Sequence, residues 1–387
     1  VAAASFNFVV DKFADGADDL PGDGSCSSGA VEGCSLRAAI QEANALTGAH
    51  TITLLTGTYS LSVVGMGEDA AATGDLDISA NLTIIGAGAS VTLIDANGLD
   101  RAFHVSAGFS LNLSGLTIQE GLANPGGAIL VDGEAFISQV AFLNNEAPDT
   151  SRLGSGGAVY LSDGASATIT LSQFDNNYAY FGGGAIADAV TPSLIVNDST
   201  FTSNSSVLGG GAIYLNGTSA TINNSTFVSN ISDVGGAIHS NAIAVAINNS
   251  TFVNNSATNN GAVDARVGTI TINNSTLSGN SASGLGATLG GQIGTGGTVE
   301  VSNSILSSGD PDNCEGIIID LGHNLSWPAG NNCPGTQADP LLGSLGDNGG
   351  NTDTLPLLIG SPAIGAGNNA TCEVTDQRGV ARPQGAT

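Results

Sequence analysis

Two neighbouring stretches decide the fold: GGAIHSNAIAVAINNSTFVNNSA at 235–257 and GAVDARVGTITINNSTLSGNSA at 261–282. Both open on a glycine–alanine step and later place an apolar residue three positions before an asparagine. Alignment of the chain on these two anchors gives six repeats that are 25 to 30 residues apart. The first anchors are Ala128, Ala158, Ala185, Ala212, Ala237 and Ala262. The second anchors are Phe142, Phe174, Phe201, Phe227, Phe252 and Leu277, followed by Asn145, Asn177, Asn204, Asn230, Asn255 and Asn280.

The repeat length predicts a solenoid built from strands. Within each unit apolar residues alternate with polar ones, as in the stretch 269–273, TITIN, and alternation of this kind indicates β-strands. A propeller blade takes about 40 residues, whereas 25 residues suffice for one coil of three short strands. We therefore expect a single right-handed parallel β-helix of roughly ten coils.

Stacked coils place equivalent residues above one another, so the repeats should form ladders. The phenylalanine anchors form one expected internal ladder. Two more expected ladders are Ile129, Val159, Ile186, Ile213, Ile238 and Val263, and Ile137, Ile169, Val196, Ile222, Ile247 and Ile272. The asparagine column is expected at a bend, where this residue tolerates unusual backbone angles and its amide can bond from coil to coil. The paired glycines should open the next strand where no Cβ fits.

Both ends of the chain differ from the repeats. Residues 1–50 are expected to form an N-terminal cap with a helix at 35–46, because Leu36, Ala39, Ile40 and Ala43 follow helical spacing behind the N-cap candidate Ser35. The β-helix is expected over 51–300, with the clearest repeats at 126–282. Residues 301–387 are expected to form the last coils and an irregular C-terminal cap.

Composition excludes several classes of partner. The chain has 7 basic and 34 acidic residues, and its net charge of -27 would repel nucleic acid and anionic lipid. No apolar run reaches the roughly 20 residues that a membrane helix needs, so direct membrane insertion is not expected. The abundance of Ser, Thr and Asn beside a single lysine is common in exported proteins.

The cysteines also indicate an oxidising compartment. Cys26 and Cys34 form one close pair and Cys314 and Cys333 another, without zinc-ligand spacing, so two disulfides are expected. Cys372 is the odd one. We expect it to pair with a cysteine beyond Thr387, where the gene would continue, or with a neighbouring subunit.

One column of the repeat carries residues that could bind a ligand. The second residue after each alignment alanine should face outward, which would expose Tyr214, His239 and Asp264 side by side, with Arg266 two residues on. The functional interpretation is a strip that contacts sugar or metal. The alternative, which we favour, is an ordinary polar exterior. His50, His104 and His323 are interpreted as surface or turn residues.

Acidic residues give a secondary hypothesis of calcium binding. The run DGADDLPGDG contains Asp15, Asp18, Asp19 and Asp23, and two more aspartates lie at 310 and 312. Neither stretch matches an EF-hand or the nonapeptide calcium repeat. Solvated acidic loops are the favoured interpretation, and no other cofactor is expected.

Three stretches resemble known families. The GGAI and FxxN pairs over 126–280 resemble repeats of the polymorphic outer membrane proteins, which are chlamydial surface adhesins. VEGCSLRAAIQEANA resembles the CSLREA domain of secreted bacterial β-helix proteins, with Ala38 where glutamate is usual. The tail DPLLGSLGDNGGNTDTLPLLIGSPAIGAG resembles the choice-of-anchor Q region of the same proteins. These resemblances imply an exported surface protein.

The expected function is therefore non-enzymatic. The chain is interpreted as an extracellular or cell-surface adhesin that contacts a host or matrix glycan or protein, or as a self-associating building block of an extracellular fibre. The alternative is a β-helix polysaccharide lyase or glycoside hydrolase, since the fold itself hosts such enzymes. A lyase needs a strong cation, and within the repeats only Arg152 and Arg266 supply one.

Overall fold

The protein is a parallel β-solenoid of about nine turns with one short helix near its N-terminus, which confirms the predicted fold class. The computed structural model describes residues 5–150, 153–217, 219–284, 286–291, 294–309, 313–329 and 332–383. Arg152, Asp310, Asp312 and Thr387 lie outside the described residues. The chain divides into two compact units, 1–180 with 185–193 and 181–184 with 194–387.

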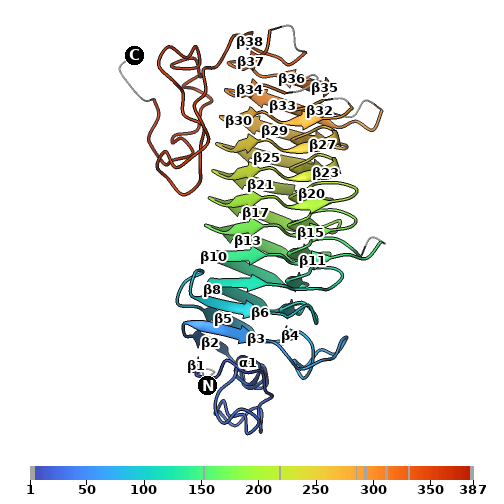
Figure 1. The fold of residues 1–387 in the computed structure, drawn as a ribbon, viewed down its shortest axis with the longest axis vertical. Helices are drawn as coiled ribbons and strands as arrows, with labels where there is room; N and C mark the ends of the chain where they lie inside the picture. Colours follow the sequence, from blue (N-terminus) through green and yellow to red (C-terminus); the bar gives the residue numbers. More distant parts are fainter. Residues whose placement is uncertain are drawn as a thin grey trace. The chain divides into compact units, whose positions relative to one another are not determined.

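In the first unit the coils contribute strands to two parallel sheets, and a third parallel sheet begins only at β11 (Figure 1). The largest sheet receives β1 (Asn7–Val10), β2 (Ala49–Leu54), β3 (Gly57–Ser60), β5 (Asn81–Ile85), β6 (Thr92–Asp95), β8 (Ser110–Gln119), β10 (Glu134–Leu143), β13 (Ser166–Thr170) and β14 (Gln173–Asp175). The second contains β4 (Leu76–Ile78), β7 (Phe103–Val105), β9 (Ile129–Val131), β12 (Val159–Leu161) and β16 (Ile186–Asp188). The third contains β11 (Glu146–Ala147) and β15 (Tyr178–Ala179).

The second unit repeats the same order of strands. Its strands of the largest sheet are β17 (Ser193–Asn197), β18 (Thr200–Thr202), β21 (Ser219–Asn223), β22 (Thr226–Val228), β25 (Ala244–Asn248), β26 (Thr251–Val253), β29 (Thr269–Asn273), β30 (Thr276–Ser278), β33 (Thr298–Ser302), β34 (Ile305–Ser307), β36 (Ile318–Asp320), β37 (Leu325–Trp327) and β38 (Thr336–Gln337). The second sheet receives β20 (Ile213–Leu215), β24 (Ile238–Ser240), β28 (Val263–Ala265), β32 (Leu289–Gly291) and β35 (Cys314–Gly316). The third receives β19 (Ser205–Ser206), β23 (Ile231–Val234), β27 (Ser256–Asn259) and β31 (Ser281–Ala282).

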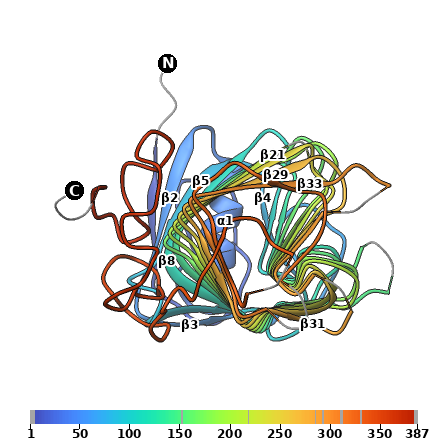
Figure 2. The ribbon, with the colours of Figure 1, turned by 90° about the horizontal axis from the view of Figure 1, so that it is seen from above.

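The helix α1 (Leu36–Ala45) packs against β1, β2 and β4 of the first unit, and the end-on view shows it there (Figure 2). Ser35 is its N-cap and accepts a hydrogen bond from the Ala38 N–H at 3.0 Å. Leu36 and Ile40 are buried on the inner face. The helix therefore shields apolar side chains of the first strands from water, as predicted.

The phenylalanine ladder fills the interior of each unit. Phe142 stacks on Phe174 in the first unit with ring centroids 4.7 Å apart. In the second unit Phe227 lies 4.7 Å from Phe201 and 4.6 Å from Phe252. All five side chains are fully buried. The near-parallel rings follow from strand pairing in register, because equivalent residues repeat at the strand spacing.

The asparagine ladder is a chain of hydrogen bonds rather than a site of unusual backbone angles. In the second unit the Nδ2 of Asn230 donates to Oδ1 of Asn255 at 2.9 Å, and Asn255 donates likewise to Asn280 at 3.0 Å. The left-handed backbone angle lies one residue earlier, as at Ser229 and Asn254. The expectation that the ladder asparagine itself has the unusual angle was wrong. Its buried amide instead satisfies neighbouring backbone groups.

The paired glycines have two different roles. Gly235 has a φ of 62°, which favours glycine, and Asn260 takes the equivalent place one coil later with a φ of 59°. Gly236 is different, because a Cβ there would lie 2.2 Å from the carbonyl oxygen of Gly261. The first glycine provides the turn, and the second allows adjacent coils to approach closely.

The C-terminal region does not simply continue the stack. Strands β33 to β38 form the last coils, but the segment 341–383 runs back along the second unit (Figure 1). Glu373 N–H donates to Asn274 at 2.9 Å, and Arg382 donates to Asn249 at 2.8 Å. Thr251 donates to Gln377 at 2.7 Å. This segment therefore lines the turns between paired strands of the largest sheet, a position that differs from the expected end cap.

Both predicted disulfides are present, between Cys26 and Cys34 and between Cys314 and Cys333. Cys372 has no disulfide partner among the described residues, and its Sγ lies 3.3 Å from Asn274 Nδ2. The disulfide partner expected for Cys372 stays a prediction. Among the described residues no helix is both long and apolar enough to span a membrane.

Candidate functional site

The predicted strip of Tyr214, His239 and Asp264 is assembled by three neighbouring strands of the second unit. Tyr214 is in register with His239, and His239 with Asp264. The tyrosine and histidine rings stack with centroids 5.4 Å apart. Nδ1 of His239 lies 2.6 Å from Oδ2 of Asp264, but the two atoms lack the alignment of a hydrogen bond. Arg266 follows β28 and is exposed.

The expectation that this strip is exposed was wrong. His239 is 5% exposed and Asp264 is fully buried. A Cβ on Gly209 would lie 3.3 Å from the His239 ring, so the preceding loop covers it. Asn260 donates a hydrogen bond to Asp264, and Asn241 donates to the hydroxyl of Tyr214 at 2.9 Å. This packing leaves little histidine or aspartate surface for a ligand.

The four aspartates of the calcium hypothesis are held by separate contacts. Asp15 pairs with the buried Arg37 at 2.7 Å. Burial acts to raise the pKa of Asp15, but Arg37 and the backbone N–H groups of Ser62 and Val63 bring it below its usual value. Asp18, Asp19 and Asp23 accept backbone hydrogen bonds from Ser27, Gly29 and Ser25. The loop therefore uses these carboxylates for its own structure.

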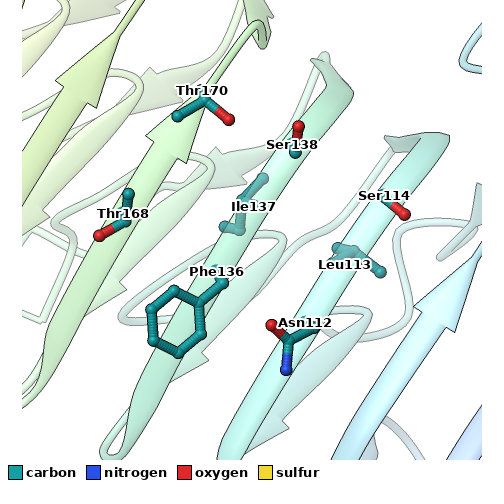
Figure 3. Close-up of a pocket in the computed structure, with 8 residues that line it drawn as sticks. All are labelled: Asn112, Leu113, Ser114, Phe136, Ile137, Ser138, Thr168 and Thr170. Carbon is teal, nitrogen blue, oxygen red and sulfur yellow. The ribbon is translucent and has the colours of Figure 1, made fainter.

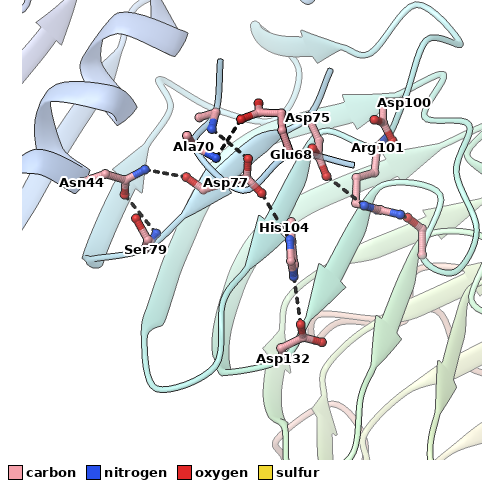
Figure 4. A network of polar contacts seen from close by, with 12 residues as sticks. Asn44, Glu68, Ala70, Asp75, Asp77, Ser79, Asp100, Arg101, His104 and Asp132 are labelled. Carbon is pink, nitrogen blue, oxygen red and sulfur yellow. Dashed lines mark hydrogen bonds and ion pairs between the residues drawn. The ribbon is translucent and has the colours of Figure 1, made fainter. Parts of the chain in front are cut away.

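A polar network that sequence reasoning missed lies in the first unit (Figure 4). His104 on β7 is in register with Asp77 on β4, and its Nδ1 lies 3.2 Å from Asp77 Oδ1. Its Nε2 lies 2.9 Å from Oδ2 of Asp132, which follows β9. The contact with Asp77 raises the pKa of His104 to about 9 against the opposing effect of burial, and Asp132 adds to the rise.

Next to this histidine, Arg101 pairs with Asp75 at 2.9 Å (Figure 4). Burial raises the pKa of Asp75 to about 6 although Arg101 lowers it, because Asp100 and Asp77 add repulsion. The interpretation of His104 as a surface or turn residue was therefore wrong. His50 is buried, so its interpretation as a surface or turn residue was wrong too, while His323 is exposed at a positive φ.

Asp69, Asp77 and His104 could hold a metal ion, because one ligand atom from each lies within 4.8 Å of the others. Asp132 would then orient the histidine through its second nitrogen. However, both imidazole nitrogens already contact a carboxylate. A protonated histidine between two aspartates accounts for this geometry, so the cluster is an ion pair of His104 with both carboxylates.

The outer face of the largest sheet contains a shallow depression of about 370 Å³ in the first unit (Figure 3). Phe136 stands in it and is 43% exposed. Strand pairing places Asn112 of β8 on one side of this ring and Thr168 of β13 on the other. The remaining lining consists of Leu113, Ser114, Ile137, Ser138 and Thr170. An exposed aromatic ring thus lies among uncharged side chains. The repeat pattern did not predict this arrangement, because the residue type at this position changes from coil to coil.

Comparison with known proteins supports the repeat and adds little about activity. The Chlamydia polymorphic membrane protein repeat matches residues 198–216, which include the anchors Phe201, Asn204 and Ala212. No curated protein matches. The resemblances of the two ends to the CSLREA and choice-of-anchor Q regions stay predictions.

Two solved structures have a distantly similar fold. One is the alginate lyase AlyGC of the PL6 family, with a TM-score of 0.43 and 12% identity over 83% of this chain. The other is an arginine-to-alanine mutant of that lyase, with a TM-score of 0.42 and 13% identity over 90% of this chain. The chain spans 54% and 56% of these two proteins. At such values the likeness carries no inference about activity.

Proposed function

We propose that the protein is a non-enzymatic cell-surface solenoid with an adhesin-like role. The observation that carries this proposal is the match of residues 198–216 to a repeat of polymorphic membrane proteins. The matched anchors are the residues that build the coil in the structure, since Phe201 stacks on Phe227 and Asn204 bonds to Asn230. The likeness therefore concerns the construction of the solenoid and not an incidental run of residues.

The distribution of constant and variable positions supports a binding role. Inward positions repeat the same residue type from coil to coil, as at Ile137 and Ile169. Outward positions in the same strands change, so that Asn112, Phe136 and Thr168 occupy one register. A repeat scaffold with a constant core and a varied face is suited to present an extended recognition surface.

Binding to intact surfaces tests this proposal against the enzymatic alternative. Labelled protein is incubated with bacterial and host cells, with extracellular matrix and with purified polysaccharides. Saturable binding without release of unsaturated or reducing-end products supports the adhesin-like role. Steady production of such products, proportional to protein concentration, overturns it. The proposal requires no cofactor, and we expect a chelator to leave binding unchanged.

A structural role in an extracellular fibre is the second form of the same proposal. Strand edges and flat sheet faces can pair with further copies unless they are protected. Light scattering and electron microscopy over a range of concentrations test it directly. Filaments that form without ligand would favour a building block, whereas a monodisperse protein that binds cells would favour the adhesin.

A further inference from the structure

We propose that the depression around Phe136 is a binding site for a neutral polysaccharide, an inference that names the ligand class of the proposed surface function. The ring is the first reason. A phenylalanine side chain in a packed sheet protein is usually buried, and the ladder phenylalanines of this chain are fully buried. Phe136 instead has 43% of its surface exposed, on the solvent side of β10.

Unused hydrogen-bonding groups are the second reason. Among the described residues, no side-chain hydrogen bond engages Asn112, Ser114, Ser138, Thr168 or Thr170. These amide and hydroxyl groups can donate and accept toward solvent or a ligand. The corresponding face of the second unit differs, because Asn248 donates to Asn223 at 3.0 Å and Asn223 donates to Asn197 at 2.8 Å.

Charge identifies the class of sugar. All eight residues that line the depression are uncharged, in a chain with 34 acidic and 7 basic residues. A polyuronate or sulfated glycan would meet no cation here and would be repelled by the overall charge. An uncharged hexopyranose polymer meets neither obstacle. Its C–H-rich face packs on the ring, since the aromatic face is negative and C–H groups are weakly positive.

The arrangement of the strands fits a chain rather than a single sugar. Thr83 of β5, Asn112, Phe136 and Thr168 lie in one register across four coils. Adjacent strands are about 4.8 Å apart, so polar groups recur beside the ring at a spacing close to the length of one sugar unit. The site therefore accepts a polymer that crosses the strands, with one sugar on Phe136 and its neighbours bonded to the flanking amide and hydroxyls.

The test compares four proteins: the wild type, Phe136→Ala, Phe136→Trp and, as a control, Ile231→Ala. Ile231 is also exposed but lies on β23 in another sheet. Binding to cellohexaose, mannohexaose and polygalacturonate is measured by calorimetry or by chemical shift changes. Because the Phe136 side chain is half exposed, its truncation should leave the melting temperature nearly unchanged, which is checked for every variant.

We expect one neutral oligosaccharide to bind, Phe136→Ala to weaken it by about tenfold or more, and Phe136→Trp and Ile231→Ala to retain it. Failure of both neutral sugars to bind, tighter binding of polygalacturonate, or equal affinity of Phe136→Ala overturns the inference. The inference is also overturned if Phe136→Ala loses self-association but keeps its affinity for the sugar. Cell binding together with sugar binding that are both unaffected by Phe136→Ala would refute this site alone, while sugar binding without cell binding would refute only the proposed function.

Discussion

His104 and His239 occupy the same position of the coil in the two units. Each is the middle residue of a three-residue strand in the same kind of sheet, and each faces an aspartate of a neighbouring coil. The side chain of His104 keeps 16% of its surface exposed and contacts two carboxylates. That of His239 keeps 6% and stacks on Tyr214. The repeat thus fixes which residues are neighbours, while the loop above decides whether they contact water.

Truncation of a buried phenylalanine should have the largest effect on stability, and the effects of the histidine variants can be compared with it. Phe252 is fully buried and stacks on Phe227, so Phe252→Ala should lower the free energy of unfolding by about 3–5 kcal/mol. Chemical denaturation measures this cost, with the exposed Ile243→Ala as a control. If Phe252→Ala were milder than truncation of His239, the assignment of inner and outer faces would be wrong.

Replacement of His239 should cost more packing energy than replacement of His104. An outward orientation would make His239→Ala almost silent, but its burial under Gly209 and its stacking on Tyr214 predict a loss of about 2 kcal/mol. A double-mutant cycle with Tyr214→Ala measures the coupling between the rings. A loss below about 0.5 kcal/mol, the range of surface substitutions, would show that the loop does not cover this site in solution.

Sequence reasoning predicted the repeated part of the fold well. The solenoid and the neighbours of His239 follow from periodicity, because parallel coils place residues one period apart in register. The helix follows from its own helical spacing and N-cap residue, and the disulfide pairs follow from the close spacing of their cysteines. The same reasoning could have predicted the position of His104 in the coil. It follows Ala102 by two residues, as His239 follows Ala237, but the glycine pair that marks later repeats is absent there.

What the sequence could not show depends on contacts between distant segments. The cover over His239 comes from residues of a preceding turn, and the path of 341–383 is set by single contacts such as Arg382 with Asn249. The burial of Arg37 follows from its pairing with Asp15 across 22 residues. Phe136 belongs to an outward position that does not repeat. These contacts and the exposure of Phe136 do not recur from repeat to repeat, so only the three-dimensional structure reveals them.

The pH dependence of stability should test the ion pair of His104. The folded protein raises the pKa of His104 from 6.5 to about 9, so it holds the proton more tightly than the unfolded chain. The stabilisation is therefore complete below pH 6.5 and is lost as pH rises to about 9. Allowing for solvent screening, we expect a loss of about 2 kcal/mol across this window.

Denaturation at several pH values measures that loss. His104→Gln should remove most of the loss of stability between pH 6.5 and 9. Asp75 does not interfere, because its raised pKa of about 6 affects stability between pH 3.8 and 6, where ionisation of the buried carboxylate destabilises the fold. An unchanged window in His104→Gln would contradict the assignment of the proton to His104.

The smallest effect is expected from calcium, and it tests whether acidic density alone makes a binding site. A calcium site would place oxygen ligands from several carboxylates around one ion. Asp15 is instead neutralised by Arg37, and Asp23 bonds to its own loop at Ser25. We therefore expect the melting temperature to differ by less than about 1 °C between millimolar calcium and a chelator. A calcium concentration of a hundred times the Kd of a site would stabilise the protein by about 2.7 kcal/mol, which would raise the melting temperature by several degrees.

Two variants serve as controls for the calcium measurement. Asp15→Asn should destabilise the protein equally in both conditions, because it loses the ion pair with Arg37 and not a bound ion. A calcium-dependent rise that Asp23→Asn abolishes would instead show that the loop rearranges to bind the metal.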